Sequence, residues 1–199
     1  MKKIVLILAV VVLAICVAFA LFFKFGNAEK SEAEAEVLTS VSFETTISSD
    51  KEYMALNYGE EYRWYETTAV MNNFLDEECD GSIESVGSVF QVTTEEDETS
   101  MDTEVIFTSH TEATHDYIVK HGFYVGDRDL CHAPIILKFD DAFAKVMESD
   151  YPKPHSRYCV LRKQIGPKES NPQYIFGNEK YALFVDAISG EVTDQNPAY

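Results

Sequence analysis

The chain has 199 residues, of which 16 are Lys or Arg and 34 are Asp or Glu, so its formal net charge is -18. An apolar fraction of 46% is typical of a folded globular protein and excludes a disordered acidic chain. The negative charge also argues against nucleic-acid binding, because contact with phosphates requires clustered Lys and Arg.

The charge is distributed unevenly along the chain. Residues 1–25 contain three lysines and no acid, and residues 26–132 contain 5 basic and 25 acidic residues. Residues 133–199 are nearly neutral, with 8 basic and 9 acidic residues. The acidity therefore belongs to one half of the chain, which predicts two units with different surfaces.

The N-terminal segment has the pattern of a membrane anchor. An uninterrupted run of 20 residues without charge, Gly or Pro begins at Ile4 and ends at Phe23. A helix of that length spans about 30 Å, the thickness of a bilayer core. A cleaved signal peptide has a shorter apolar core, and Ile15 is too large to precede a lipid-modified Cys16. We therefore expect a retained single-pass signal anchor in residues 1–25 and favour it over a cleaved, secreted form.

Charges beside this run predict its orientation. Two lysines and the free amine precede it and one lysine follows, so the positive-inside rule places the N-terminus in the cytoplasm. We expect a protein of the inner (cytoplasmic) membrane whose residues 26–199 lie outside the cytoplasm, on the periplasmic side. Residues 26–36 contain Ala, Glu and Ser but no large apolar residue, which predicts a solvated acidic tether.

Residues 37–132 are predicted to form an acidic, antiparallel β-rich unit. Apolar residues alternate with polar ones from Val37 to Ile47, which indicates a strand, and a short helix after it ends at Gly59. Residues 62–75 are ambiguous, and their β-branched and aromatic content favours a strand over a helix.

Further strands are predicted over residues 82–94 and 103–110, with another over 117–125. Val86, Phe90 and Val92 share one face of the first, whereas Val105 and Phe107 are expected to face the core from the second.

Residues 133–199 are predicted to form a helix followed by strands. Apolar residues with helical spacing from Phe139 to Met147 indicate an amphipathic helix over 139–149. Strands are expected over 157–165, 174–176 and 181–185, and Asp186–Gly190 has the composition of a turn. No internal sequence repeat is strong enough to identify.

Two motifs in this half resemble a known family. Phe139-Asp140-Asp141-Ala142 enters the predicted helix, and Leu183-Phe184-Val185-Asp186-Ala187-Ile188-Ser189-Gly190-Glu191-Val192 closes the predicted strands. Together they are similar to the PepSY domain of thermolysin-type protease propeptides, over about residues 135–193. Lys138 stands where that family often has a Ser or Thr cap. The resemblance implies an extracytoplasmic α+β domain associated with inhibiting or chaperoning a peptidase, and it brings no catalytic residues.

The expected fold class is therefore α+β. An N-terminal transmembrane helix is followed by an antiparallel β-rich unit (37–132) and a PepSY-like helix-plus-antiparallel-sheet unit (133–199).

Three cysteines follow the anchor, so at most one disulfide can form among them. A bond between Cys131 and Cys159 would join the two ends of the helical region, but the sequence leaves the pairing open. A Cys–His dyad is conceivable for Cys131 with His132 or for Cys159 with His155. Neighbouring residues on a strand point to opposite faces, which counts against the first.

Metal and cofactor sites are not expected. His110, His115 and His121 lack the spacing of a zinc motif, and we interpret them as ordinary loop residues. The acidic runs 76–80 and 95–97 lack the spacing of a calcium loop, which favours solvated turns.

Four basic residues lie in one stretch without an acid between them: Arg157, Arg162, Lys163 and Lys168. They could bind an acidic partner or the acidic half of the same chain, or form a solvated strand face.

These features predict a membrane-anchored, extracytoplasmic, non-enzymatic binding or inhibitory module of the cell envelope, whose partner is a peptidase or another envelope protein. The alternatives are a structural subunit of an envelope complex and, more remotely, a Cys/His-dependent hydrolase.

Overall fold

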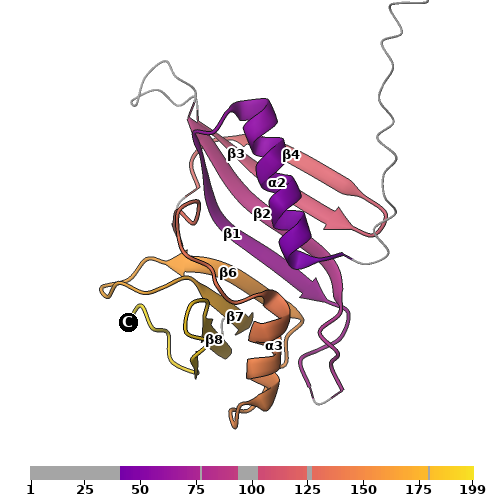
Figure 1. Cartoon of the computed structure of the whole chain (residues 1–199), viewed down its shortest axis with the longest axis vertical. Coiled ribbons are helices and arrows are strands. Elements are labelled where there is room, and N and C mark those ends of the chain that lie inside the picture. Colours follow the sequence, from indigo (N-terminus) through magenta and orange to yellow (C-terminus); the bar gives the residue numbers. More distant parts are fainter. Residues whose placement is uncertain (1–40, 77, 94–102, 125–126, 179) are drawn as a thin grey trace, which may run out of the picture. The chain divides into compact units, whose positions relative to one another are not determined.

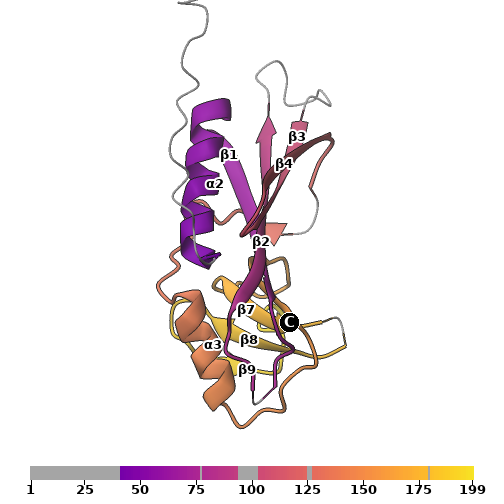
Figure 2. The ribbon, with the colours of Figure 1, turned by 90° about the vertical axis from the view of Figure 1, so that its right-hand side faces the viewer.

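The computed structural model describes residues 41–76, 78–93, 103–124, 127–178 and 180–199, which form one antiparallel sheet and two helices (Figure 1). Eight strands follow the order β4-β3-β2-β1-β6-β7-β8-β9, and β5 pairs separately with β6. Both helices pack on the same face of the sheet (Figure 2). The elements are α2 (Phe43–Tyr58), β1 (Tyr62–Met71), β2 (Ile83–Thr93), β3 (Thr103–Thr111), β4 (His115–His121), β5 (Asp127–Arg128), α3 (Phe139–Glu148), β6 (Tyr158–Gln164), β7 (Gln173–Gly177), β8 (Ala182–Asp186) and β9 (Val192–Thr193).

The predicted fold class is wrong in its division into two sheet-bearing units. Strand β1 of the acidic half pairs antiparallel with β6 of the near-neutral half, from Glu66 opposite Arg162 to Val70 opposite Tyr158. The core is also continuous, since Phe43 at the start of α2 stacks on Phe139 at the start of α3, with ring centroids 5.3 Å apart. Pairing between strands about 90 residues apart leaves no local signal in the sequence, which is why the two halves looked separate.

The sheet nevertheless contains an architectural repeat. Each half begins with a helix and continues as an antiparallel meander: α2 precedes β1-β2-β3-β4, and α3 precedes β6-β7-β8-β9. The first strands of the two meanders, β1 and β6, meet at the centre of the sheet, and the last strands, β4 and β9, form its two edges.

The strand predicted from Val41 to Ile47 is instead the first part of α2. Ser42 caps the helix by accepting a hydrogen bond from the amide of Thr45, and Gly59 ends it with a φ of 79°. The residues that face the sheet, Phe43, Ile47, Asp50 and Met54, are spaced by three or four. Asp50 is a polar residue among these buried positions, so the helical spacing of the apolar residues was hard to recognise. The alternation of apolar and polar residues up to Ile47 therefore led to the prediction of a strand.

The other elements largely match the prediction. Residues 62–71 form a strand, as favoured, and Val86, Phe90 and Val92 of β2 lie in the core. In β3 the prediction holds for Val105, which is buried, and is wrong for Phe107. Ile106, rather than Phe107, belongs to the core against the helices, and Thr108 and His110 share the face of Ile106.

Helix α3 is amphipathic as predicted, with Phe139, Ala142 and Val146 buried. Lys138, at its N-terminal cap, makes no side-chain capping bond. Instead, the carboxylate of Glu44 in α2 accepts the amide of Phe139 at 2.7 Å. The first turn of one helix therefore caps the other, and this replaces the local Ser or Thr cap.

Within the part of the chain that the structure describes, no helix is long and apolar enough to cross a membrane. The predicted anchor (1–25) and tether (26–36) lie outside the described residues.

Candidate functional site

An open hollow of about 500 Å³ lies on the face of the sheet opposite the helices, over β6, β7 and β8. Alternation along the strands places it there, because Cys159 and Leu161 of β6 face the helix-side core and Gln164 faces away. The lining residues come from these three strands, the β7–β8 turn and the C-terminal segment: Val160, Arg162, Gln164, Ile175, Gly177, Asn178, Lys180, Tyr181, Ala182, Phe184, Asp194 and Asn196.

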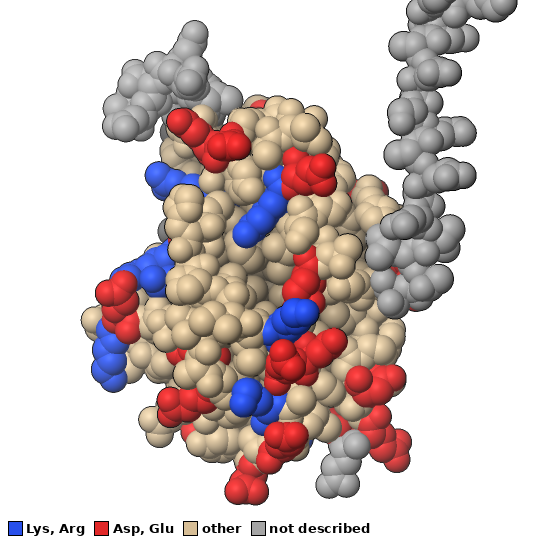
Figure 3. All heavy atoms as spheres, viewed as in Figure 1, with Lys and Arg blue, Asp and Glu red and all other residues tan. Residues whose placement is uncertain are grey.

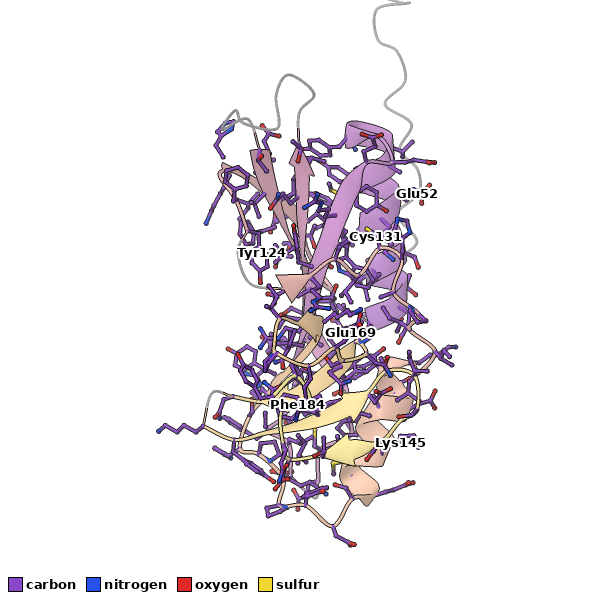
Figure 4. All side chains as sticks on the ribbon, turned by 90° about the vertical axis from the view of Figure 1, so that its left-hand side faces the viewer. Glu52, Tyr124, Cys131, Lys145, Glu169 and Phe184 are labelled. Atoms are coloured by element: carbon purple, nitrogen blue, oxygen red, sulfur yellow. The ribbon has the colours of Figure 1, made fainter. Side chains whose placement is uncertain are left out.

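The floor of the hollow is apolar. Val160, Ile175 and Phe184 stand side by side on three neighbouring strands, since Val160 pairs with Ile175 and Ile175 pairs with Phe184. Figure 4 labels Phe184 on β8. A row of three apolar side chains across strands is a surface that an apolar group of a ligand can cover.

Two polar groups in the hollow have no hydrogen-bond partner. The side-chain oxygen of Gln164, a residue that is 8% exposed, is buried and unpaired, and so is the hydroxyl of Tyr181. Leaving a buried polar atom unpaired costs about 1–3 kcal/mol. The Tyr181 hydroxyl is protonated at neutral pH and can donate, and burial raises its pKa further. The lining of the hollow therefore contains an unpaired acceptor and an unpaired donor beside an apolar floor, both covered by neighbouring atoms in this structure.

The four basic residues predicted as a partner-binding set do not form one patch. Arg157 pairs with Glu84 and donates to the carbonyl of Met71, and Lys163 lies 3.7 Å from Glu169.

Arg162 lies 3.8 Å from Glu66 and is the member of this set that lines the hollow. Lys168 lies in the loop before β7. Contacts with the acidic half of the same chain therefore involve Arg157 and Arg162. Acidic and basic side chains are interspersed on the helix-bearing face (Figure 3).

The described cysteines carry free thiols, and no disulfide joins Cys131 and Cys159. Cys159 is fully buried in the sheet core, and the thiol of Cys131 donates to the carbonyl of Tyr62, beside α2 (Figure 4). Burial raises the pKa of all three thiols, to about 11 for Cys131. None of them hydrogen-bonds to a described histidine. Because thiolates are the reactive form, this arrangement does not favour a Cys–His nucleophile.

The histidines, by contrast, were wrongly interpreted as loop residues: His110 lies in β3, His115 and His121 lie in β4, and His110 is buried against a carboxylate. Asp50 of α2 and His110 of β3 are 0% and 2% exposed, and Asp50 accepts from Nε2 of His110 at 2.6 Å. The Nδ1 atoms of His110 and His115 are 2.6 Å apart, so one of them donates a hydrogen bond to the other. The second Asp50 oxygen accepts the hydroxyl of Thr108 at 2.7 Å.

This polar cluster links the helix to the sheet and reaches the surface at His115. Neither His110 nor His115 hydrogen-bonds to a described serine or cysteine, so no nucleophile accompanies them. Among the described residues, no three His, Cys, Asp or Glu side chains converge to hold a metal ion. The cluster is therefore best interpreted as the polar attachment of α2 to β3. The period-two pattern of β3, taken one residue out of phase, would have placed His110 on the core side.

None of the protein families, curated proteins or solved structures compared with the chain matches it. The interpretation of its function therefore depends on the hollow and on the sequence motifs.

Proposed function

We propose that the protein is a non-enzymatic binding module of the cell envelope, held at the membrane by residues 4–23, that binds a partner through the hollow over β6–β8. The observation that carries this proposal is the unpaired, nine-tenths buried side chain of Gln164 beside an apolar floor. A folded protein retains such an uncompensated group at a cost in stability, and a ligand that donates to it would offset that cost.

The chemistry of the hollow suits a segment of protein chain. An apolar side chain can cover Val160, Ile175 and Phe184. Once the side chains that cover the two polar groups shift, a backbone amide can donate to the Gln164 oxygen and a backbone carbonyl can accept from Tyr181. We propose a peptidase or another envelope protein as the partner. Support for the peptidase comes from the PepSY resemblance of residues 135–193 and from the helix and antiparallel strands found there.

The test uses the full-length chain in detergent micelles against a panel of purified secreted and envelope peptidases. We expect inhibition or complex formation with at least one peptidase. Gln164→Leu should weaken this binding about tenfold, since the apolar side chain cannot accept a hydrogen bond.

Gln195→Leu is the matched control, because Gln195 is exposed and does not line the hollow. It should bind like the wild type. If no peptidase is bound or inhibited, the peptidase is not the partner. If binding is unaffected by Gln164→Leu, the hollow is not the site.

A further inference from the structure

Strand β4 is an exposed edge of the sheet. It spans seven residues, and among the described strands it pairs with β3 alone; every residue except Tyr117 is exposed. The opposite edge, β9, has only two residues. The outward-facing amides and carbonyls of such a strand can pair with another strand, and proteins commonly blunt long edges to prevent this.

The apolar residues of β4 are unusually exposed for a strand. Ile118 is 53% exposed on the helix-free face, and Val119 is 43% exposed on the other face. Proline is absent from β4, and its single lysine, Lys120, lies with its ammonium 5.0 Å from the ring centre of Phe107. If another strand joined this edge, apolar side chains on both of its faces would be buried away from water, which favours the association.

The sequence of β4 is complementary to itself when two copies run antiparallel. Centred on Ile118, the middle of the strand, all seven residues of one copy pair with seven of the other. In this register Asp116 lies opposite Lys120 of the other copy, and the pair occurs twice. Neither residue forms an ion pair with a described residue of its own chain. Opposite charges directly across strands stabilise a pair by roughly 0.2–1 kcal/mol.

Other symmetric registers are poorer. A two-fold axis perpendicular to the sheet keeps each side chain on the same face, so the axis must pass between two copies of one residue. The nearest alternative registers are therefore centred on Tyr117 or Val119, and each pairs only five residues of β4. They place Asp116 or Lys120 opposite Ile118, which leaves a charge against an apolar side chain. In the central register, Ile118 meets its own copy and Val119 meets Tyr117. The longest overlap is therefore also the one that matches the charges.

We propose that β4 is a dimerisation strand. Two copies of the chain pair β4 to β4, antiparallel about Ile118, so that one sheet continues through both copies with all its helices on one face. This contact lies on a different strand from the hollow over β6–β8 and does not depend on the function proposed for it.

Oxidative cross-linking of the full-length chain in membranes tests the register. Ile118→Cys places two thiols directly opposite each other, within the range of a disulfide. Val119→Cys places them two residues apart, where Cβ atoms are about 7–8 Å apart and a disulfide does not form without strain. We expect about tenfold more covalent dimer for Ile118→Cys than for Val119→Cys, with the wild-type chain as the background for native thiols.

Charge exchange provides the second test. In the Ile118→Cys chain, Asp116→Lys or Lys120→Asp places like charges opposite each other twice and should reduce the cross-linked dimer several-fold, and the double exchange should restore it. Circular dichroism spectra and melting curves identify any variant that fails to fold.

Three results would overturn the proposal: equal cross-linking at positions 118 and 119, no rescue by the double exchange, or cross-linking of position 118 to a different protein alone. The last would assign the edge to a strand of another partner.

Discussion

The two halves of the sheet have the same order of elements but attach their helices differently. In the N-terminal half, α2 is tied to the sheet by a buried carboxylate, Asp50, through His110 and Thr108. In the C-terminal half, the buried residues of α3 are all apolar: Phe139, Ala142 and Val146. The comparison shows that one architecture can be held by either kind of contact, provided that buried polar groups are paired.

The helix-free faces differ as well. In the N-terminal half, Tyr124 from the segment after β4 packs on Tyr65, with ring centroids 5.1 Å apart, and its amide donates to Gln91. In the C-terminal half, the corresponding face is left open as the hollow beside Gln164. One half has therefore covered part of its outer face, around Tyr65 and Gln91, and the other has a hollow lined by unpaired polar groups.

The largest expected effect comes from removing the contact that joins the halves. Phe139→Ala takes away a buried ring that stacks on Phe43 and lies 6.0 Å from Phe176, and it should lower the free energy of unfolding by about 3–5 kcal/mol. Urea unfolding followed by both fluorescence and circular dichroism should still show a single transition. Phe123→Ala, at an exposed position, should change stability by less than about 0.5 kcal/mol. Two separate transitions in the wild type would contradict a continuous core.

The polar attachment of α2 is the next largest effect. Asp50→Ala leaves His110 and Thr108 buried without their acceptor and should destabilise the protein by about 3 kcal/mol. Asp50→Asn keeps one acceptor and should fall between this variant and the wild type. Glu52→Ala, on the exposed side of the same helix, is the control. Equal stability of the Asp50→Ala and Glu52→Ala variants would show that the buried cluster does not hold α2.

Glu44 links the halves through a single hydrogen bond. Glu44→Ala removes the acceptor for the amide of Phe139 and should cost about 1 kcal/mol, with faster hydrogen exchange in the first turn of α3. Glu44→Gln keeps a side-chain oxygen and should retain most of the protection. Unchanged exchange in α3 after Glu44→Ala would mean that this cap is formed by other groups.

The smallest effect at neutral pH concerns Cys131. Burial, followed by the nearby Asp129 carboxylate, raises the pKa of this thiol from 9.0 to about 11. The thiol of the unfolded chain ionises first, so this contribution to stability is present below pH 9 and is lost as the pH rises from 9 to 11. Cys131→Ala should flatten the fall in unfolding free energy over this range. A slope identical to that of the wild type would exclude a titrating Cys131 as its cause.

Local patterns predicted most of the elements. The spacing of Phe139, Ala142 and Val146 located α3, and the β-branched content of residues 62–71 identified β1. Asp186, Ser189 and Gly190 marked a turn in which the Asp186 carboxylate accepts two backbone amides and Gly190 has a φ of 72°. The prediction failed at α2, where Asp50 occupies a core position that a hydrophobic pattern assigns to an apolar residue.

The candidate site could not be predicted in the same way. Val160, Ile175 and Phe184 become neighbours only through strand register, and Gln164 is an unremarkable residue until its burial and missing partner are known. The buried pair of Asp50 and His110 likewise depends on which face of β3 meets α2.

The sequence by itself determined the types of most elements, the charge of each half and the apolar run at the N-terminus, because these follow from composition and short-range periodicity. The tertiary structure alone decided that β1 and β6 join the halves into one sheet, that Glu44 caps α3, and that Gln164 is buried without a partner. The first two depend on residues about 90 positions apart, and the third depends on the face that a strand presents, so no local pattern encodes them.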